Sequence, residues 1–273
     1  NPLDGVAYHI MQDSKGDIWV ATKGRGIIRL HPQGERFAVT YYEHDPDDIY
    51  SLSHNSVYWL HEDNNHRIWV ATFGGGLNYM EKSADGDYVF INSRNNLKGF
   101  PIDQCYRLRH VTSDSEGNIW VGSSDGVLCF KENFKSPESI EFHHYVLDPT
   151  DTNSLSSNNV HHILCTQIGD VYMATFGGGL NKVERMDENG NVLFKNYTKE
   201  DGLHSDILLS LEEDADGNLW MSTESGLSKF LIEEQRFENY NERDFDKKVR
   251  FEESTSVCFC NQSVGFGTAS GVL

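Results

Sequence analysis

The sequence predicts an all-β fold, and three observations support this prediction. A motif centred on an aromatic residue recurs six times at nearly constant spacing, each copy carries short runs of β-branched and aromatic residues, and no segment shows sustained helical periodicity. A repeat this regular is typical of a protein assembled from similar structural units. The aromatic anchors, which lie 50, 51, 52, 48 and 46 residues apart, are Trp19, Trp69, Trp120, Tyr172, Trp220 and Phe266.

Each repeat unit is expected to contain four strands. The first is short and apolar, as at 57–62 and 208–213, and an Asp-x-x-Gly turn follows it, most clearly at 214–218. Glycine supplies the positive φ of a tight hairpin, and aspartate caps nearby backbone amides. The second strand, Ile-Trp-Val-Ala-Thr at 68–72, suits burial on both faces, and a Gly-rich turn leads to the third strand at 76–81. The fourth strand is amphipathic, with copies expected at 37–42, 88–92, 140–146, 192–197 and 237–240.

Four antiparallel strands at this period are the signature of a β-propeller blade. One such sheet cannot cover both of its apolar faces, so blades stack face to face with the anchor ring wedged between neighbours. We expect residues 1–273 to form one propeller of about five complete blades and a partial one. Neither end carries an obvious missing fourth strand, so the chain is expected to be a fragment of a longer, seven-bladed propeller; a six-bladed ring with a defective seam is the alternative. The blades are expected at about 5–43, 56–93, 105–147, 158–198 and 206–241, with the partial blade at 254–273.

Composition and charge exclude several classes of partner. The 273 residues include 23 basic and 42 acidic side chains, a formal net charge of −19. Nucleic acids and anionic membranes are recognised by basic surfaces, so neither is an expected partner. No apolar stretch approaches 18 residues, so this segment is not expected to insert into a membrane, and its first residues do not resemble a signal peptide. The five cysteines contain no CxxC pair, and Cys258 and Cys260 are poorly spaced for a disulfide within a strand, so we expect packing thiols.

The sequence predicts no catalytic residue, no cofactor and no metal site. It contains no Gly-x-Ser-x-Gly, His-Glu-x-x-His or phosphate-binding loop. The segment 214–218 resembles the start of a calcium loop, but the twelfth position holds Ser225 where a calcium loop needs Glu. The Asp-x-x-Gly-x-x-Trp pattern also resembles the Asp-box of sialidase propellers, which is a structural turn. A sialidase would also need a cluster of arginines. The arginines grouped near one loop are Arg94, Arg107 and Arg109, and ion pairing within an acidic chain explains them equally well.

Ligand-binding residues are expected on the loops at one end of the blades. The long polar segments 45–55, 94–104, 148–158 and 199–206 gather there with the short turns between second and third strands. Aromatic faces and directed polar groups on such loops are typical of ligand-binding sites. Phe73 and Phe176 occupy the same repeat position, and each precedes a Gly triplet that lets a ligand approach the backbone. The alternative is that these rings pack on the neighbouring loop. Arg25, in the corresponding turn of the first repeat, and Arg107 complete this group.

A second set of candidates lies ten residues before the anchors, within each first strand. In a propeller these strands line the central channel, so the side chains could form a polar and stacking ring for a ligand. The alternatives are wet channel residues or side chains packed between blades. A metal site is not expected. Side chains arranged around the central axis of a propeller lie too far apart to bind one metal ion with bonds of about 2.1 Å. The positions hold His9, Trp59, His110 and His162, followed by Ser210 and Ser256.

The repeats also resemble a specific family. The segments 44–57, 148–158 and 199–205, together with Asp-Gly-Asn-Leu-Trp-Met-Ser-Thr at 216–223 and its copies, resemble the two-component-regulator propeller repeat. That repeat is typical of periplasmic sensor regions of hybrid two-component histidine kinases in Bacteroidetes. The resemblance covers about residues 5–273. Three departures are His66 in place of the turn glycine, a weak turn at 166–169, and a sixth repeat without Asp or Gly in its turn.

The resemblance implies an extracytoplasmic, periplasmic ligand-sensing module of a sensor kinase. It further implies an oligosaccharide ligand, contact with the remaining sensor domains of the same chain and a homodimer in the full protein. No kinase motif is found in this sequence, so the chain itself is not expected to be an enzyme. The alternatives are a propeller glycoside hydrolase or lyase and a protein-interaction scaffold.

Overall fold

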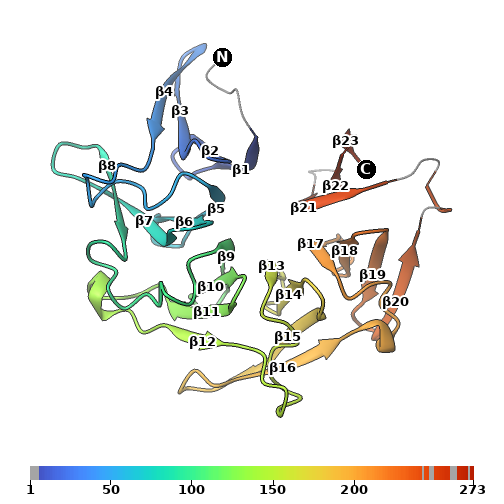
Figure 1. Cartoon of the computed structure of the whole chain (residues 1–273). Helices are drawn as coiled ribbons and strands as arrows, with labels where there is room; N and C mark the ends of the chain where they lie inside the picture. The colour runs from blue at the N-terminus through green and yellow to red at the C-terminus, as the bar shows by residue number, and fades with distance from the viewer. Residues whose placement is uncertain (1–5, 242, 246–248, 259–262, 270) are drawn as a thin grey trace. The chain divides into compact units, whose positions relative to one another are not determined.

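The computed structural model describes residues 6–241, 243–245, 249–258, 263–269 and 271–273. Two compact units, 1–144 and 145–273, are described separately. Among the described residues the strands form six antiparallel sheets, five of four strands and one of three, each following chain order (Figure 1). These are the blades of a β-propeller, so the all-β prediction is confirmed. That the chain belongs to a longer, seven-bladed propeller stays a prediction.

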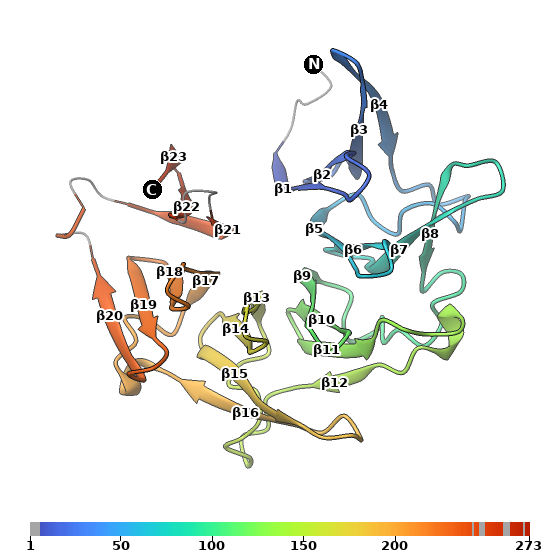
Figure 2. The same cartoon turned by 180° about the vertical axis from the view of Figure 1, so that it is seen from behind.

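The first unit holds the first three sheets. Their strands are β1 (Ala7–Gln12), β2 (Ile18–Thr22), β3 (Ile27–Gln33) and β4 (Arg36–Tyr42); β5 (Val57–Glu62), β6 (Ile68–Thr72), β7 (Gly76–Lys82) and β8 (Tyr88–Asn92); and β9 (Leu108–Ser113), β10 (Asn118–Ser123), β11 (Gly126–Lys131) and β12 (His143–Tyr145), with the short 3-10 helix η1 (Pro137–Ser139) before β12. The first strands β1, β5 and β9 lie side by side, as both views show (Figures 1 and 2).

The second unit holds the other three sheets. Their strands are β13 (Val160–Cys165), β14 (Val171–Thr175), β15 (Gly179–Met186) and β16 (Val192–Tyr197); β17 (Leu208–Glu213), β18 (Leu219–Thr223), β19 (Leu227–Leu231) and β20 (Arg236–Tyr240); and β21 (Phe251–Cys258), β22 (Val264–Thr268) and β23 (Gly271–Val272), with η2 (Lys199–Asp201) before β17. Here β13 contacts β17, and β17 contacts β21.

The third sheet departs from the predicted strand pattern. We expected its fourth strand at 140–146, but β12 contains only His143–Tyr145. The turn at Pro137–Ser139 ends directly before this segment, and Ile140, which follows the turn, is buried in the apolar core of the unit. With that side chain buried in the core, strand pairing begins only at His143.

The anchor rings form the core between successive sheets. Trp19 is fully buried in a cluster with Leu60, Val70, Met80 and other residues of the second sheet. Trp69 packs in the same way with residues of the third sheet, and Tyr172 with residues of the fifth. Burying an aromatic ring of this size removes roughly 200 Å² from water, or about 5 kcal/mol at ~25 cal/mol per Å². The predicted wedge is therefore confirmed at these three anchors.

In four of the repeats, the aspartate of the turn holds the anchor as well as the hairpin. In the first repeat, Asp13 Oδ1 accepts the backbone N–H groups of Lys15 and Asp17, while Oδ2 accepts the indole N–H of Trp19 at 2.9 Å. The same indole bond joins Trp69 to Asp63, Trp120 to Asp114 and Trp220 to Asp214 at 2.7–2.9 Å.

Two departures from the repeat pattern have local explanations. The fourth repeat has Thr166 in place of the aspartate and Tyr172 in place of the tryptophan, so the indole donor and its carboxylate acceptor are lost together. His66, in place of the turn glycine, adopts a φ of 60° and so keeps the hairpin in the left-handed region.

The described cysteine side chains are buried or partly buried. Cys105 and Cys129 are fully buried, as expected of packing thiols, and Cys165 is partly buried. The side chains of Cys258 and Cys260 lie outside the described part of the structure. Within the described residues, no helix has the length and apolar character needed to cross a membrane.

Candidate ligand-binding site

Each sheet has two ends that differ in chemistry. The hairpin end carries the turns between first and second strands. These turns contain the aspartates that lie six residues before the anchor tryptophans. The loop end carries the turns between second and third strands, together with the long connections from one sheet to the next. The polar groups of the hairpin end join successive sheets, whereas the loop end collects the candidate ligand residues.

A repeated hydrogen bond joins neighbouring sheets at the hairpin end. The backbone N–H of Ser14 donates to Glu62 Oε2 at 2.6 Å, and the backbone N–H of Gln167 donates to Glu213 Oε2 at 2.8 Å. Both glutamates lie seven residues before the anchor of the next sheet. These contacts give Glu62 and Glu213 a structural role.

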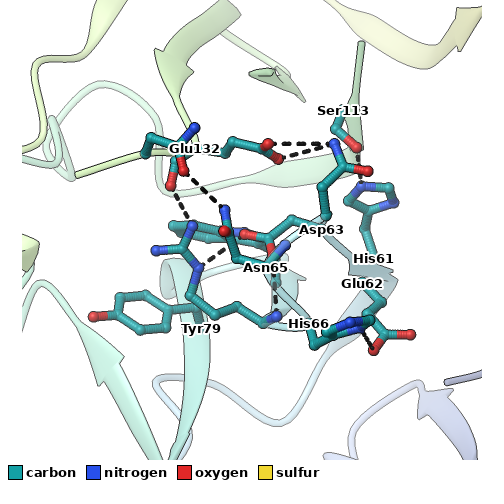
Figure 3. Close-up of polar contacts among 12 residues, drawn as sticks. His61, Glu62, Asp63, Asn65, His66, Tyr79, Ser113 and Glu132 are labelled. Atoms are coloured by element: carbon teal, nitrogen blue, oxygen red, sulfur yellow. Dashed lines mark hydrogen bonds and ion pairs between the residues drawn. The ribbon is translucent and has the colours of Figure 1, made fainter. Parts of the chain in front are cut away.

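The second and third sheets use a different set of contacts at the hairpin end (Figure 3). Ser113 occupies the glutamate position of the third repeat, and its hydroxyl lies 2.7 Å from His61 Nε2. Asn64 donates to both carboxylate oxygens of Glu132 at 3.2–3.3 Å, and the Arg67 guanidinium donates to the Glu132 carbonyl. Burial lowers the pKa of His61 to about 4, although Asp63 and Glu62 oppose the shift.

At the loop end, a β-bulge changes the direction of one side chain in each of the first five sheets. The register between first and second strands shifts around the residue eleven positions before the anchor. A bulge of this kind turns a side chain away from the regular alternation of a strand, often beside a binding site. The bulged residues are Tyr8, Tyr58, Arg109, His161 and Leu209.

In the first unit, the bulged residues build a continuous aromatic stack, which we call the Tyr8–Phe73 stack (Tyr8, Tyr58, Phe73 and Arg109). Tyr8 stacks on Tyr58 with ring centroids 4.3 Å apart, and Tyr58 stacks on Phe73 at 4.9 Å. The guanidinium of Arg109 lies 5.2 Å from the centre of Phe73 and 5.8 Å from that of Tyr58. All four side chains are partly exposed. The predicted residue Phe73 therefore lies within a larger aromatic surface.

The residues predicted by counting ten positions before the anchor form a second row. His9 stacks on Trp59 at 3.7 Å, and Trp59 lies 4.1 Å from His110. His9 and Trp59 are partly exposed, while His110 is only 3 % exposed. The three side chains come together, but the row becomes progressively buried toward the third sheet.

In the second unit, the corresponding surface is smaller. Phe176 is 43 % exposed and stacks on His161, which is itself buried, at 5.2 Å. His162 is 6 % exposed, and burial lowers its pKa to about 3. Ser210 is fully buried and bonds Ser222 at 2.7 Å, and the side chain of Ser256 lies outside the described part of the structure.

The Gly triplets after Phe73 and Phe176 have a structural explanation. A Cβ on Gly75 would lie 2.5 Å from the hydroxyl of Ser53, and a Cβ on Gly178 would lie 2.5 Å from that of Ser156. Ser53 belongs to the Ser-Leu-Ser segment of the preceding loop, and its hydroxyl accepts a bond from Asn78 at 2.7 Å. The middle glycine is therefore required by loop packing, not by approach of a ligand.

The arginines have distinct environments. Arg25 is exposed in its turn. Arg94 donates to the carbonyls of Asp45 and Pro46 at 3.1 Å, so it clamps a loop. The backbone of Arg107 forms an isolated antiparallel β-bridge with that of Phe73. The Cζ atom of its guanidinium lies 4.9 Å from the centre of the Tyr106 ring.

Sequence reasoning missed Tyr8, Tyr58 and His161 as site residues. The signal was present, because a count of eleven positions before each anchor gives Tyr8, Tyr58, Arg109 and His161. Side chains alternate between the two faces of a regular strand, and this alternation gave no reason to choose the position eleven residues before the anchor, where the bulge occurs. In the described residues, no group of three or more His, Cys, Asp or Glu side chains is arranged to hold a metal ion.

Comparison with known proteins identifies the repeats. The family model described as two-component regulator propeller matches residues 2–24, 51–74 and 201–225. These three segments match the two-component regulator propeller repeat. Each matched segment runs from a first strand through the Asp turn to an anchor tryptophan, so the predicted resemblance is confirmed.

A curated relative and three solved structures are similar to these two-component regulator propeller repeats. Histidine kinase P4 of Formosa agariphila is 24 % identical over 237 residues, 84 % of this chain and 16 % of the relative, so the chain spans about one sixth of that protein.

The solved structures show the fold. The extracellular domain of a one-component system from B. thetaiotaomicron is 21 % identical with a TM-score of 0.69, covering 98 % of this chain and 34 % of that one. The extracellular domain of a hybrid two-component system from the same organism is 20 % identical with a TM-score of 0.54, covering 99 % and 39 %. Virginiamycin B lyase from Staphylococcus aureus is 14 % identical with a TM-score of 0.65, covering 100 % and 80 %.

Proposed function

We propose that this chain is an extracytoplasmic ligand-sensing propeller module of a hybrid two-component sensor kinase and that it binds an oligosaccharide at its loop end. The Tyr8–Phe73 stack is the observation that carries the proposal. Three partly exposed rings and a guanidinium form one surface from three successive sheets. Aromatic faces pack against the C–H surfaces of sugar rings, and an arginine donates directed hydrogen bonds to oxygen.

The position of the stack suits a sensor. Its side chains come from β1, β5 and β9 and from the turn after β6, so one ligand would contact three sheets. Binding energy that differs between two arrangements of the full protein would then drive signalling. The proposal includes a periplasmic location, contact with the remaining sensor domains of the same chain and a homodimer of the whole protein. A similar curated protein is a histidine kinase, which supports this placement.

Isothermal titration against an oligosaccharide library tests the proposal. We expect at least one glycan to bind, with a loss of tenfold or more in the Phe73→Ala/Phe176→Ala double variant. Phe37→Ala is the matched control, because Phe37 is 51 % exposed on the outer strand β4 and lies outside the stack. Unchanged affinity in the double variant would show that the two rings are structural.

The same preparation separates the alternative functions. Fold alone does not decide between them, because sensor domains and lyases both use this architecture. A propeller glycoside hydrolase or lyase would turn over a polysaccharide and lose that activity on mutation of a loop-end carboxylate. A protein-interaction scaffold would bind no saccharide in calorimetry and would bind a protein at the same surface.

A further inference from the structure

The third sheet places two arginines beside the Tyr8–Phe73 stack in an otherwise acidic chain. The formal net charge is −19, yet two arginines lie at the start of the third sheet. The backbone of Arg107 pairs with that of Phe73 while its guanidinium lies over Tyr106, and the guanidinium of Arg109 lies over the Phe73 ring. A guanidinium that lies on an aromatic face keeps its N–H donors in its own plane. A ligand stacked beside Arg109 would therefore meet those donors at its edge.

The second arginine faces an incomplete polar contact. Arg107 Nη2 lies 3.9 Å from Asp125 Oδ2, which is too long for a hydrogen bond. Within the described residues, Arg107 Nε and Asp125 Oδ2 are buried atoms without a hydrogen-bond partner. The two side chains are 41 % and 40 % exposed, so a ligand group can reach the space between Arg107 Nη2 and Asp125 Oδ2 and bridge them. The two arginines outnumber the single carboxylate, so an anionic group is favoured over a cation.

We propose that the ligand of the Tyr8–Phe73 stack is an acidic sugar whose carboxylate or sulfate binds Arg109 and Arg107. This inference rests on the proposed function and specifies its substrate class. The sugar ring packs on Tyr58 and Phe73, the anionic group accepts hydrogen bonds from the two guanidinium groups, and a sugar hydroxyl donates to Asp125. Arginine matches planar oxyanions with two parallel hydrogen bonds, which makes the contact specific as well as strong.

The second unit supplies an internal comparison. Phe176 has the repeat position of Phe73, and it forms the same backbone bridge with Ile207 that Phe73 forms with Arg107. The bulged residue of the next sheet is Leu209 where the first unit has Arg109. The Phe176 surface therefore has the aromatic ring without the two cations, and it is expected to show no preference for acidic sugars.

Three methyl glycosides test the inference by NMR titration of the isotopically labelled chain. The probes are methyl α-D-glucopyranosiduronate, methyl α-D-glucopyranoside 6-sulfate and methyl α-D-glucopyranoside. At least one acidic probe is expected to bind tenfold or more tightly than the neutral one, to shift the arginine Nε–H resonances, and to weaken as salt is added. The carboxylate and sulfate arms identify which anion is preferred.

Variants separate this inference from a structural role for the arginines. Arg107→Gln/Arg109→Gln should reduce the affinity for the acidic probe to that for the neutral probe, while Leu209→Gln should leave it unchanged. Arg109→Lys keeps the charge without the planar fork and should give an intermediate loss. Thermal melts of each variant confirm folding. An acidic preference that survives the double variant would overturn the inference, as would equal binding or no binding of the acidic probes.

The two experiments distinguish failure of the acidic-sugar inference from failure of the proposed function. Binding of neutral library glycans that depends on Phe73, without a preference for acidic probes, would overturn this inference and leave the proposed function standing. Failure of every saccharide to bind would overturn both.

Discussion

Ser14 and Glu62 join the first two sheets through two hydrogen bonds to one carboxylate. The Ser14 hydroxyl donates to Glu62 Oε1 at 2.6 Å, and its backbone N–H donates to Oε2 at 2.6 Å. Burial alone would raise the pKa of Glu62, but the bonds from Ser14 and from His66 hold it below its ordinary value of 4.5. The folded state thus favours the charged carboxylate.

Glu62→Gln should destabilise the first unit by about 1 kcal/mol, because an amide cannot accept both bonds with the strength of a carboxylate. The measurement is the urea midpoint followed by tryptophan fluorescence. Glu81→Gln is the control, since Glu81 is an exposed carboxylate of β7 that accepts a bond from Tyr79 within its own strand. The stabilisation should be present above pH 4.5 and lost as pH falls through the lower folded-state pKa. An equal loss in both variants would contradict the inter-sheet role.

Asp114→Ala should be among the most destabilising changes in the first unit. The carboxylate accepts two backbone amides of its turn and the indole N–H of Trp120 at 2.7 Å, and its loss leaves buried donors without an acceptor. We expect a cost of about 2–4 kcal/mol in the free energy of unfolding. Thr166→Ala at the equivalent position of the fourth sheet has no indole partner and should cost about 1 kcal/mol or less. Similar costs at the two positions would argue against the aspartate–indole bond as the main contribution.

Gly178→Ala should be destabilising for a reason that differs from the usual glycine argument. Its backbone does not need a positive φ, but the added Cβ would lie 2.5 Å from Ser156 Oγ and 2.8 Å from the Ser156 carbonyl carbon. Displacement of this loop should cost about 2 kcal/mol or more. Gly177→Ala is the matched control, because it has a φ of 99° and open space around the added Cβ, so it should cost only about 1–2 kcal/mol of backbone strain. Thermal melts of the two variants give the comparison, and a larger effect at Gly177 would contradict the packing argument.

Two histidines should make stability depend on pH in mildly acidic conditions. Burial lowers the pKa of His61 to about 4 and that of His162 to about 3, from an ordinary value of 6.5. Below pH 6.5 the unfolded chain therefore binds more protons at these sites than the folded chain, and stability falls as pH falls. The slope for each histidine approaches about 1.4 kcal/mol per pH unit once the unfolded side chain is fully protonated. Between pH 6.5 and 5 the loss is about 1.6 kcal/mol each.

Urea unfolding of the wild type and His162→Gln over this pH range tests the effect. The variant should lose part of the slope, because His61 and His54, whose pKa values burial also lowers, still titrate. The range above pH 5 keeps the carboxylates, whose ordinary pKa values are 3.8–4.5, largely outside the titration. A slope that does not change in His162→Gln would show that this side chain is not buried in its neutral form.

The local pattern of the sequence was sufficient to predict most strands and turns of the fold. The anchors, the Asp turns and the strand at Val57–Glu62 could be predicted because hairpin geometry and two-sided burial act on residues near one another in sequence. The short β12 could not, since the burial of Ile140 among residues of other strands decided where the ladder begins. Phe73 was also predicted as a site residue, but its partners Tyr8 and Tyr58 were not.

The sequence by itself determined that this protein is built from repeated four-strand units whose aromatic anchors pack between sheets. Only the tertiary structure decided which side chains share a surface. One-residue bulges in β5 and β9 turn Tyr58 and Arg109 toward Phe73, and the stacking of neighbouring sheets brings Tyr8 beside them. The physical reason is that strand formation depends on neighbours along the chain, whereas the direction of a bulged side chain and the sheet it meets depend on packing between distant segments.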